Sequence, residues 1–244
     1  MRSLIHVLPL FAAVCLSVSV DAAAQTERHE LLVGRQQTSL QAPADWQYVR
    51  RDAEHVFKNR SEQVRVLDSG PLTREGFARE IRQARRLFLG NQIDESIVLL
   101  NRLKLRAAFP SQAQWQAVVS SWRRISRSSI GSSHAERRAV EDAYADVLSQ
   151  VAALPTRGLE SLAIAALDAL EPTDRRDVRM QQPVSVDGRV GLLVETWDRL
   201  SHAHRTRYLF VPTGESLFVV RTEFGDFAKT GPVFDALVAS IEFH

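Results

Sequence analysis

The apolar positions near the C-terminal end of the chain follow the two periods expected of strands and of a helix. Thr206–Val211 and Ser216–Glu223 are short runs rich in β-branched and aromatic residues, and the segment between them contains Pro212 and Gly214. Proline presets one turn dihedral and glycine adopts positive φ, so this pattern predicts a β-hairpin. Further on, Val233–Ile241 has an apolar residue at every third or fourth position, which predicts a helix packed on the sheet.

The first part of the chain shows similar strand-like runs. Leu31–Ala42 is predicted to form one strand, and shorter strands are expected from Trp46, at His55–Phe57 and at Val64–Leu67. These runs are short, rich in valine and aromatic residues, and separated by turn residues. Residues 25–72 are therefore expected to form a first β block.

Residues 73–170 have the period of helices instead. Thr73 is placed to cap the first helix, whose buried face is predicted to consist of Phe77, Ile81, Ala84 and Phe88. Four further helical segments follow, and Ser133 with Glu136 has the spacing of a capping box at the start of one of them. We expect this helical block to be an insertion between two β blocks.

Residues 171–244 return to strands. Val178–Val186 contains Pro183, which cannot donate to a ladder and therefore favours an edge strand. Asp187-Gly188 is a hairpin turn signal. Successive hairpins imply a mainly antiparallel sheet, so the fold class is predicted to be α+β, with N-terminal and C-terminal helices packed on the sheet and a long helical insertion.

Residues 1–24 have the pattern of a secretory signal peptide. Arg2 supplies a positive start, Leu4–Val20 is almost wholly apolar, and Ala22–Ala24 provides small residues for a cleavage site. An uncleaved membrane anchor and a lipoprotein signal using Cys15 are the alternatives. We expect a periplasmic or secreted protein with no transmembrane domain after cleavage.

The cysteine content, the net charge and the absence of known motifs exclude several kinds of functional site. Cys15 is the only cysteine and lies in the expected signal, so the mature chain has no disulfide, thiolate nucleophile or cysteine metal site. The net charge of +2 is too small to indicate a nucleic-acid partner, and no recognition motif supports one. No nucleotide-binding fingerprint or nucleophile elbow is present, so no cofactor and no catalytic residue are predicted.

His202 and His204 have the only metal-like spacing in the chain. On a strand, residues two apart lie on one face, but zinc sites usually need three or four protein ligands. A solvated turn is the alternative. Glu195 and Asp198 could act as paired carboxylates, although nothing in the sequence makes them converge.

The first helix carries arginines opposite its apolar face, at Arg79, Arg82 and Arg86. One interpretation is an ordinary solvated helix face. The other is a docking surface for an acidic protein, a lipid headgroup or a cell-wall polymer, because arginine binds carboxylate and phosphate with two parallel hydrogen bonds.

Two segments resemble a known scaffold. Leu40–Trp46, an apolar strand followed by proline and tryptophan, and the last helix, Val233–Phe243, which ends in Ser-Ile-Glu-Phe, resemble the PsbP/Mog1/DcrB-like α/β sandwich. The resemblance covers residues 30–90 and 175–244. It implies a non-catalytic binding or assembly protein, because most members of that group are of this kind and several are exported. The group shares a scaffold rather than a site, so it assigns no binding residue here.

The sequence thus leads to three hypotheses of function. The first is an exported, non-catalytic protein that binds or assembles with an envelope protein or another anionic envelope component. The second is a metal-assisted hydrolase that uses His202 and His204. The third is a carrier with a small-ligand pocket between the sheet and the helices.

Overall fold

The computed structural model describes residues 25–60, 62–103, 112–127, 133–171, 175–200, 205–223 and 227–244. The expected signal peptide, His202 and His204 lie outside these ranges. The ten described strands are β1 (Thr26–Val33), β2 (Gln36–Pro43), β3 (Gln47–Arg51), β4 (Glu54–Asn59), β5 (Glu62–Pro71), β6 (Arg176–Val186), β7 (Arg189–Asp198), β8 (Arg205–Pro212), β9 (Ser216–Glu223) and β10 (Glu242–Phe243). The six described helices are α1 (Arg74–Leu89), α2 (Ile93–Arg102), α3 (Gln112–Arg127), α4 (His134–Ala152), α5 (Leu159–Leu170) and α6 (Phe227–Ala239).

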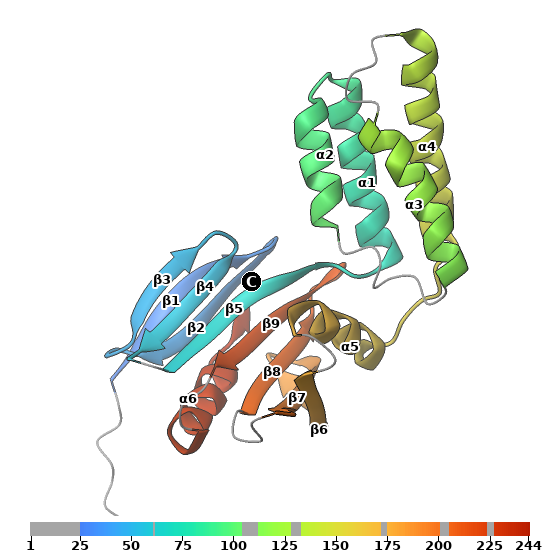
Figure 1. Ribbon diagram of the computed structural model, residues 1–244. Helices are drawn as coiled ribbons and strands as arrows, with labels where there is room; N and C mark the ends of the chain where they lie inside the picture. Colours follow the sequence, from blue (N-terminus) through green and yellow to red (C-terminus); the bar gives the residue numbers. More distant parts are fainter. Residues whose placement is uncertain are drawn as a thin grey trace, which may run out of the picture.

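The strands form two antiparallel sheets, which confirms the predicted α+β class. The small sheet has the order β1-β2-β10, and the large sheet has the order β3-β4-β5-β9-β8-β7-β6. The small sheet and α6 cover one face of the large sheet, and α5 covers the other (Figure 1). Helices α1–α4 stand together beyond one end of the large sheet (Figure 1).

Strands β8 and β9 form the centre of the large sheet and are buried on both faces. Leu209 and Val220 pack towards the small sheet and α6, whereas Phe210 and Val219 pack towards α5. A strand covered on both sides needs apolar residues at successive positions. This explains the uninterrupted apolar runs of the predicted hairpin, which the structure confirms.

The prediction of a single strand over Leu31–Ala42 is wrong. The segment turns back at Gly34, so β1 and β2 form a hairpin in which Val33 pairs with Gln36. Gly34 has φ +61°, the conformation that a tight hairpin turn requires at its first central position. Gly34 is the only glycine in the segment, which contains no proline, so little in the sequence marks the break.

The C-terminal segment also differs from the prediction. Helix α6 begins at Phe227 rather than near Val233 and ends at Ala239. Glu242 and Phe243 then pair with β2, so the expected helix end is a short strand. The backbone N–H of Phe243 donates to Asp187 Oδ2 at 2.8 Å, a long-range contact that competes with the helical hydrogen bond.

The helical insertion divides into two parts. Helices α1–α4 share a core that contains the predicted face Phe77, Ile81, Ala84 and Phe88. Helix α5 belongs to the sheet, where Ala166 and Leu167 pack against β7–β9. The Thr73 cap and the capping box of Ser133 with Glu136 both form as predicted. None of the described helices combines the length and the apolar composition needed to cross a membrane.

Pro183 lies in β6, the outermost strand of the large sheet, as expected of proline in a strand. The turn from β6 to β7 uses Asp187 and Gly188, whose φ angles of 46° and 72° are those of a two-residue hairpin turn.

Candidate functional site

The arginine face of α1 is the surface that sequence analysis singled out, and the structure separates its three members. Arg82 and Arg86 are exposed, whereas Arg79 is half-buried. Arg79 forms ion pairs with Glu80, at 3.0 Å, and with Glu215 in the β8–β9 turn. Its charge is therefore used within the molecule.

Glu215 explains why Arg79 is held in place. Its backbone carbonyl accepts hydrogen bonds from Leu72 N at 3.1 Å and from Thr73 N at 3.5 Å, just before α1 begins. A Cβ atom added to Gly76 would lie 2.9 Å from the same carbonyl oxygen, so the helix and the turn touch closely. Glu215 thus fixes the direction in which α1 leaves the sheet, and Arg79 is part of that junction.

A polar groove of about 590 Å³ lies beside the junction. Most of its charged side chains pair with each other: Arg35 lies 3.7 Å from Glu80, and Arg79 pairs with Glu80 and Glu215. Asp68 instead accepts a hydrogen bond from the neutral Ser216 Oγ at 2.6 Å. Because both arginines are paired with carboxylates, the groove offers little free positive charge to a ligand.

Arg82 and Arg86 differ from their neighbours in lacking such partners. Arg74 pairs with Glu75 at 2.6 Å, and Arg85 lies 3.6 Å from Glu141. Among the described residues, neither Arg82 nor Arg86 forms an ion pair. Arg82 also lines an open groove of about 390 Å³ between α1 and the end of α4. The two guanidinium groups, one helical turn apart, are available to a partner.

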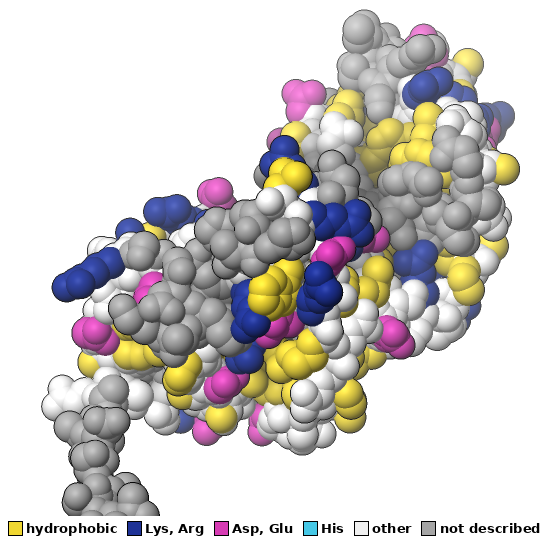
Figure 2. Space-filling view, turned by 60° about the horizontal axis from the view of Figure 1, so that its bottom comes forward, with side chains coloured by type: hydrophobic (Ala, Val, Ile, Leu, Met, Phe, Trp, Pro, Cys, Tyr) yellow, Lys and Arg dark blue, Asp and Glu magenta, His cyan; other side chains and the backbone are white. Residues whose placement is uncertain are grey.

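Basic and acidic side chains are intermingled on the face of the molecule drawn in Figure 2. In the face seen in Figure 2, basic side chains alternate with acidic and hydrophobic ones rather than gathering over one element. The described side chains visible on this face form no broad basic surface.

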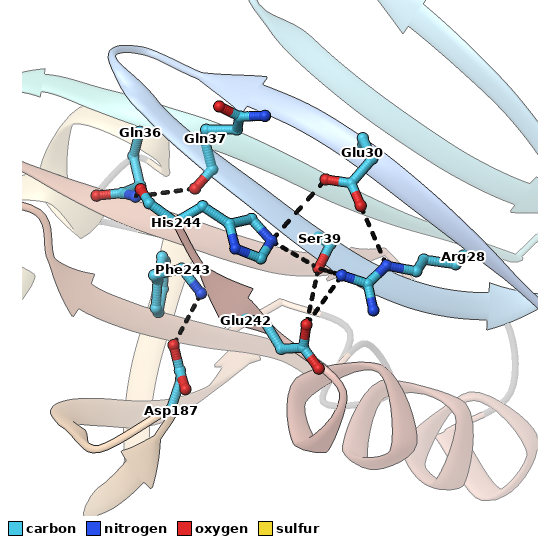
Figure 3. A network of polar contacts seen from close by, with 9 residues as sticks. All are labelled: Arg28, Glu30, Gln36, Gln37, Ser39, Asp187, Glu242, Phe243 and His244. Carbon is cyan, nitrogen blue, oxygen red and sulfur yellow. Dashed lines mark hydrogen bonds and ion pairs between the residues drawn. The ribbon is translucent and has the colours of Figure 1, made fainter.

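A second polar cluster lies on the outer face of the small sheet (Figure 3). The guanidinium of Arg28 contacts Glu30 at 3.1 Å, Glu242 at 2.9 Å and the Ser39 hydroxyl at 2.8 Å. Glu30, followed by Glu242, raises the pKa of Arg28 above its usual value. The cluster ties β1, β2 and β10 together.

Ser39 and His244 in this cluster do not form a catalytic pair. His244 Nε2 lies 3.1 Å from Ser39 Oγ and 3.9 Å from Glu30, so the serine and the carboxylate approach the same ring nitrogen. In a triad the acid binds the other nitrogen and leaves Nε2 to the serine. Ser39 is also almost fully buried. The contacts hold the strands together.

A third cluster is buried between α5 and the large sheet. The Glu171 carboxylate accepts hydrogen bonds from Tyr208 Oη at 3.1 Å and from Thr196 Oγ1 at 3.2 Å. Buried Arg176 donates to two carbonyls at the end of α5 and forms an ion pair with Asp168. Burial raises the pKa of Tyr208 far above its usual value, so its hydroxyl stays protonated and acts as a donor.

The carboxylates weighed from the sequence have separate partners. Glu195 accepts from Trp197 Nε1 at 3.2 Å and pairs with Arg207 at 3.3 Å, whereas Asp198 accepts from Leu200 N in the following turn. The described residues contain no group of three or more histidine, aspartate and glutamate side chains that could hold a metal.

No spacing or motif in the sequence points to Glu215, Ser39 or His244. Each acts on a partner far away in the chain, as Ser39 does with Glu242, and no local pattern marks such a pair. For the hairpin of β1 and β2, Gly34 was the available sign, since a glycine inside a strand-like run indicates a turn or a bulge.

Comparison with known proteins gives little beyond the fold. No family model and no curated protein matches the sequence. Among solved structures, the chain is similar to the solution structure of cyanobacterial PsbP (CyanoP) from Synechocystis sp. PCC 6803, with 11% identity and a TM-score of 0.41 over 93% of this chain and 98% of that chain. The match lies in the group that the sequence resembles, and at this TM-score it says nothing about what the chain binds.

Proposed function

We propose that the chain is an exported, non-catalytic binding protein of the cell envelope that docks an anionic partner on α1. The observation that carries the proposal is the unpaired state of Arg82 and Arg86 beside neighbours that are all neutralised within the molecule. The signal-peptide pattern of residues 1–24 supports export.

The partner is expected to be acidic for a physical reason. A guanidinium group offers a planar set of donors that matches carboxylate and phosphate, and it gains more from such a partner when water is excluded. The Cβ atoms of Arg82 and Arg86 are about 6 Å apart, because residues four apart are neighbours on a helix. An acidic envelope protein or another anionic envelope component with charges at a similar spacing would engage both.

The test replaces only the two unpaired arginines. The Arg82→Glu/Arg86→Glu variant of residues 25–244 is compared with wild type in affinity capture from envelope extract at low and moderate salt. The matched control is Arg123→Glu/Arg138→Glu, which makes the same charge change at exposed positions on α3 and α4. Arg79 is left intact, because its loss would disturb the junction with Glu215.

We expect a specific partner to be lost with the α1 variant, kept with the control, and bound more weakly as salt rises. Equal capture by all three proteins would contradict the α1 site. Equal loss in both variants would show that only overall charge matters.

Two alternatives have less support. The groove of about 590 Å³ is large enough for a small ligand, which is the observation in favour of a carrier, but most of its charged groups already form ion pairs within the molecule. For a metal-assisted hydrolase, His202 and His204 lie outside the described residues, and no described feature favours one.

A further inference from the structure

Strand β1 has one edge that its own sheet does not use. Ala44 N donates to Gln25 O at 2.8 Å, so the odd-numbered residues of β1 exchange backbone hydrogen bonds with β2. In an antiparallel ladder these pairs alternate with pairs whose backbone groups point away. The N–H and C=O groups of Arg28, Glu30 and Leu32 therefore point to the free side of β1.

The other edge of β2 is occupied in part by the short strand β10. His244 N donates to Gln37 O at 3.0 Å on the β10 side. At the β1 edge, the only hydrogen bond to an outward backbone group found among the described residues is from His55 Nε2 to Leu32 O, at 3.1 Å. The side chains of Arg28 and Glu30 lie in the polar cluster on the sheet face (Figure 3), and this leaves their outward backbone groups clear.

At this edge the small sheet is narrower than the large sheet that it covers. Tyr48 and Arg50 on β3 pair with Phe57 and His55 on β4, so all four side chains are on the face that the small sheet covers. Phe57 is fully buried there, but Tyr48 is 37% exposed. An open groove of about 710 Å³ lies along this side, lined by Leu32, Gly34, Arg50, Asp52, Ala53 and His55. The described strands of the small sheet therefore leave part of β3 uncovered, by about the width of one strand.

We propose that β1 accepts an extended segment of a partner protein, which adds to the small sheet as a strand and covers β3. A strand is the occupant that satisfies the free N–H and C=O groups of Arg28 and Glu30 and the outward N–H of Leu32, whose C=O is already bonded to His55. Its inward side chains would meet the exposed ring of Tyr48 and the guanidinium of Arg50, which has no ion pair among the described residues. The fitting segment has an apolar residue and an acidic residue two positions apart.

This site is independent of the arginine face of α1. It rests on backbone groups and on a groove in the sheet unit, and it would remain if the α1 proposal failed.

The test uses residues 25–244 and a synthetic peptide of about eight residues, the length of β1. The peptide alternates threonine with valine and has one glutamate in place of a valine. Two further peptides carry N-methyl groups, one on every threonine amide and one on every valine and glutamate amide. Binding is followed by the backbone amide signals and hydrogen exchange of Arg28, Glu30 and Leu32.

We expect the unmodified peptide to shift these signals and to slow their exchange by about tenfold or more. One methylated peptide should lose binding and the other keep it, because only one set of amides in an added strand faces β1. Glu30→Pro should abolish binding by removing an outward N–H, and Glu30→Ala, which loses the same side chain, should bind as wild type does.

Several results would overturn the proposal. It would fail if Glu30→Pro and Glu30→Ala bound the peptide equally well, or if both methylated peptides bound equally well. It would also fail if no peptide bound, or if binding shifted only the amide signals of other strands. Slow exchange of the three amides in the free protein would also overturn it. If that protection disappeared on dilution, a second copy would be the occupant, and if it persisted, the chain itself would cover the edge.

Discussion

The sheet unit and the helical unit α1–α4 are stabilised in different ways. The central strands of the sheet unit are buried on both faces, and its ends are tied by contacts between residues far apart in the chain, such as Arg28 with Glu242. The helical unit has its own core and local caps, and it is held to the sheet at the junction of Glu215 with the start of α1. Removing a contact from one unit should therefore have little effect on the other.

The largest expected effect separates the two cores. Phe77 is fully buried in the helical unit, and Phe77→Ala should destabilise that unit by about 3–5 kcal/mol. Hydrogen exchange should show lost protection in α1–α4 while β8 and β9 stay protected. The matched variant Phe218→Ala, in the core of the sheet unit, should have the reverse effect. If both variants exposed both units together, the chain would unfold as one cooperative unit.

A smaller effect compares two buried tyrosines. Tyr208→Phe removes a donor from the Glu171 carboxylate and should cost about 1–3 kcal/mol in the free energy of unfolding. Tyr144→Phe should cost less, about 0.5–1.5 kcal/mol, because Ser96 keeps its hydrogen bond to a backbone carbonyl. Urea titrations of both variants measure the difference, and equal costs would show that the charge on Glu171 adds nothing.

The junction itself can be tested at Gly76. In Gly76→Ala the new Cβ would meet the Glu215 carbonyl at 2.9 Å, so α1 must shift, and the clash outweighs the gain of up to about 1 kcal/mol in helix propensity. We expect a net loss of roughly 1 kcal/mol. Gly158→Ala is the control, because nothing lies within 4 Å of its Cβ. The melting temperatures of the two variants measure the effect. If Gly76→Ala were more stable than wild type, α1 would be packed only loosely against the β8–β9 turn.

The smallest effect depends on pH and belongs to the sheet unit. Burial lowers the pKa of His55 below its ordinary value of 6.5, so the folded state keeps the ring neutral. The unfolded chain takes up a proton first as pH falls, so the stability linked to His55 is complete above about pH 6.5 and decreases below it. His55→Gln should flatten this part of the stability–pH curve measured by urea unfolding. An unchanged slope would show that other groups cause it.

Patterns within one element predicted the fold well, and contacts between distant segments limited the prediction. The β8–β9 hairpin, the Thr73 cap and the Asp187-Gly188 turn are local and were found from the sequence. The strand β10 was missed because its two residues depend on β2, some two hundred positions away.

The same limit applies to the candidate site. Spacing identified the arginine face of α1, but the different state of Arg79 depends on Glu215, a residue in a hairpin turn that no spacing rule connects to it. Likewise, the open edge of β1 appears only when the turn at Gly34 and the position of β10 are both known.

The pairing of β2 with β10 also constrains the order of folding. Helices α1–α4 can form their core from residues close in sequence, which is a fast process. The small sheet cannot close until Glu242 and Phe243 are free to meet β2, since Arg28 and Glu242 are 214 positions apart. An emerging chain therefore carries the β1–β2 hairpin without its last strand for most of its synthesis, and completion of this sheet is a late step that follows the helices.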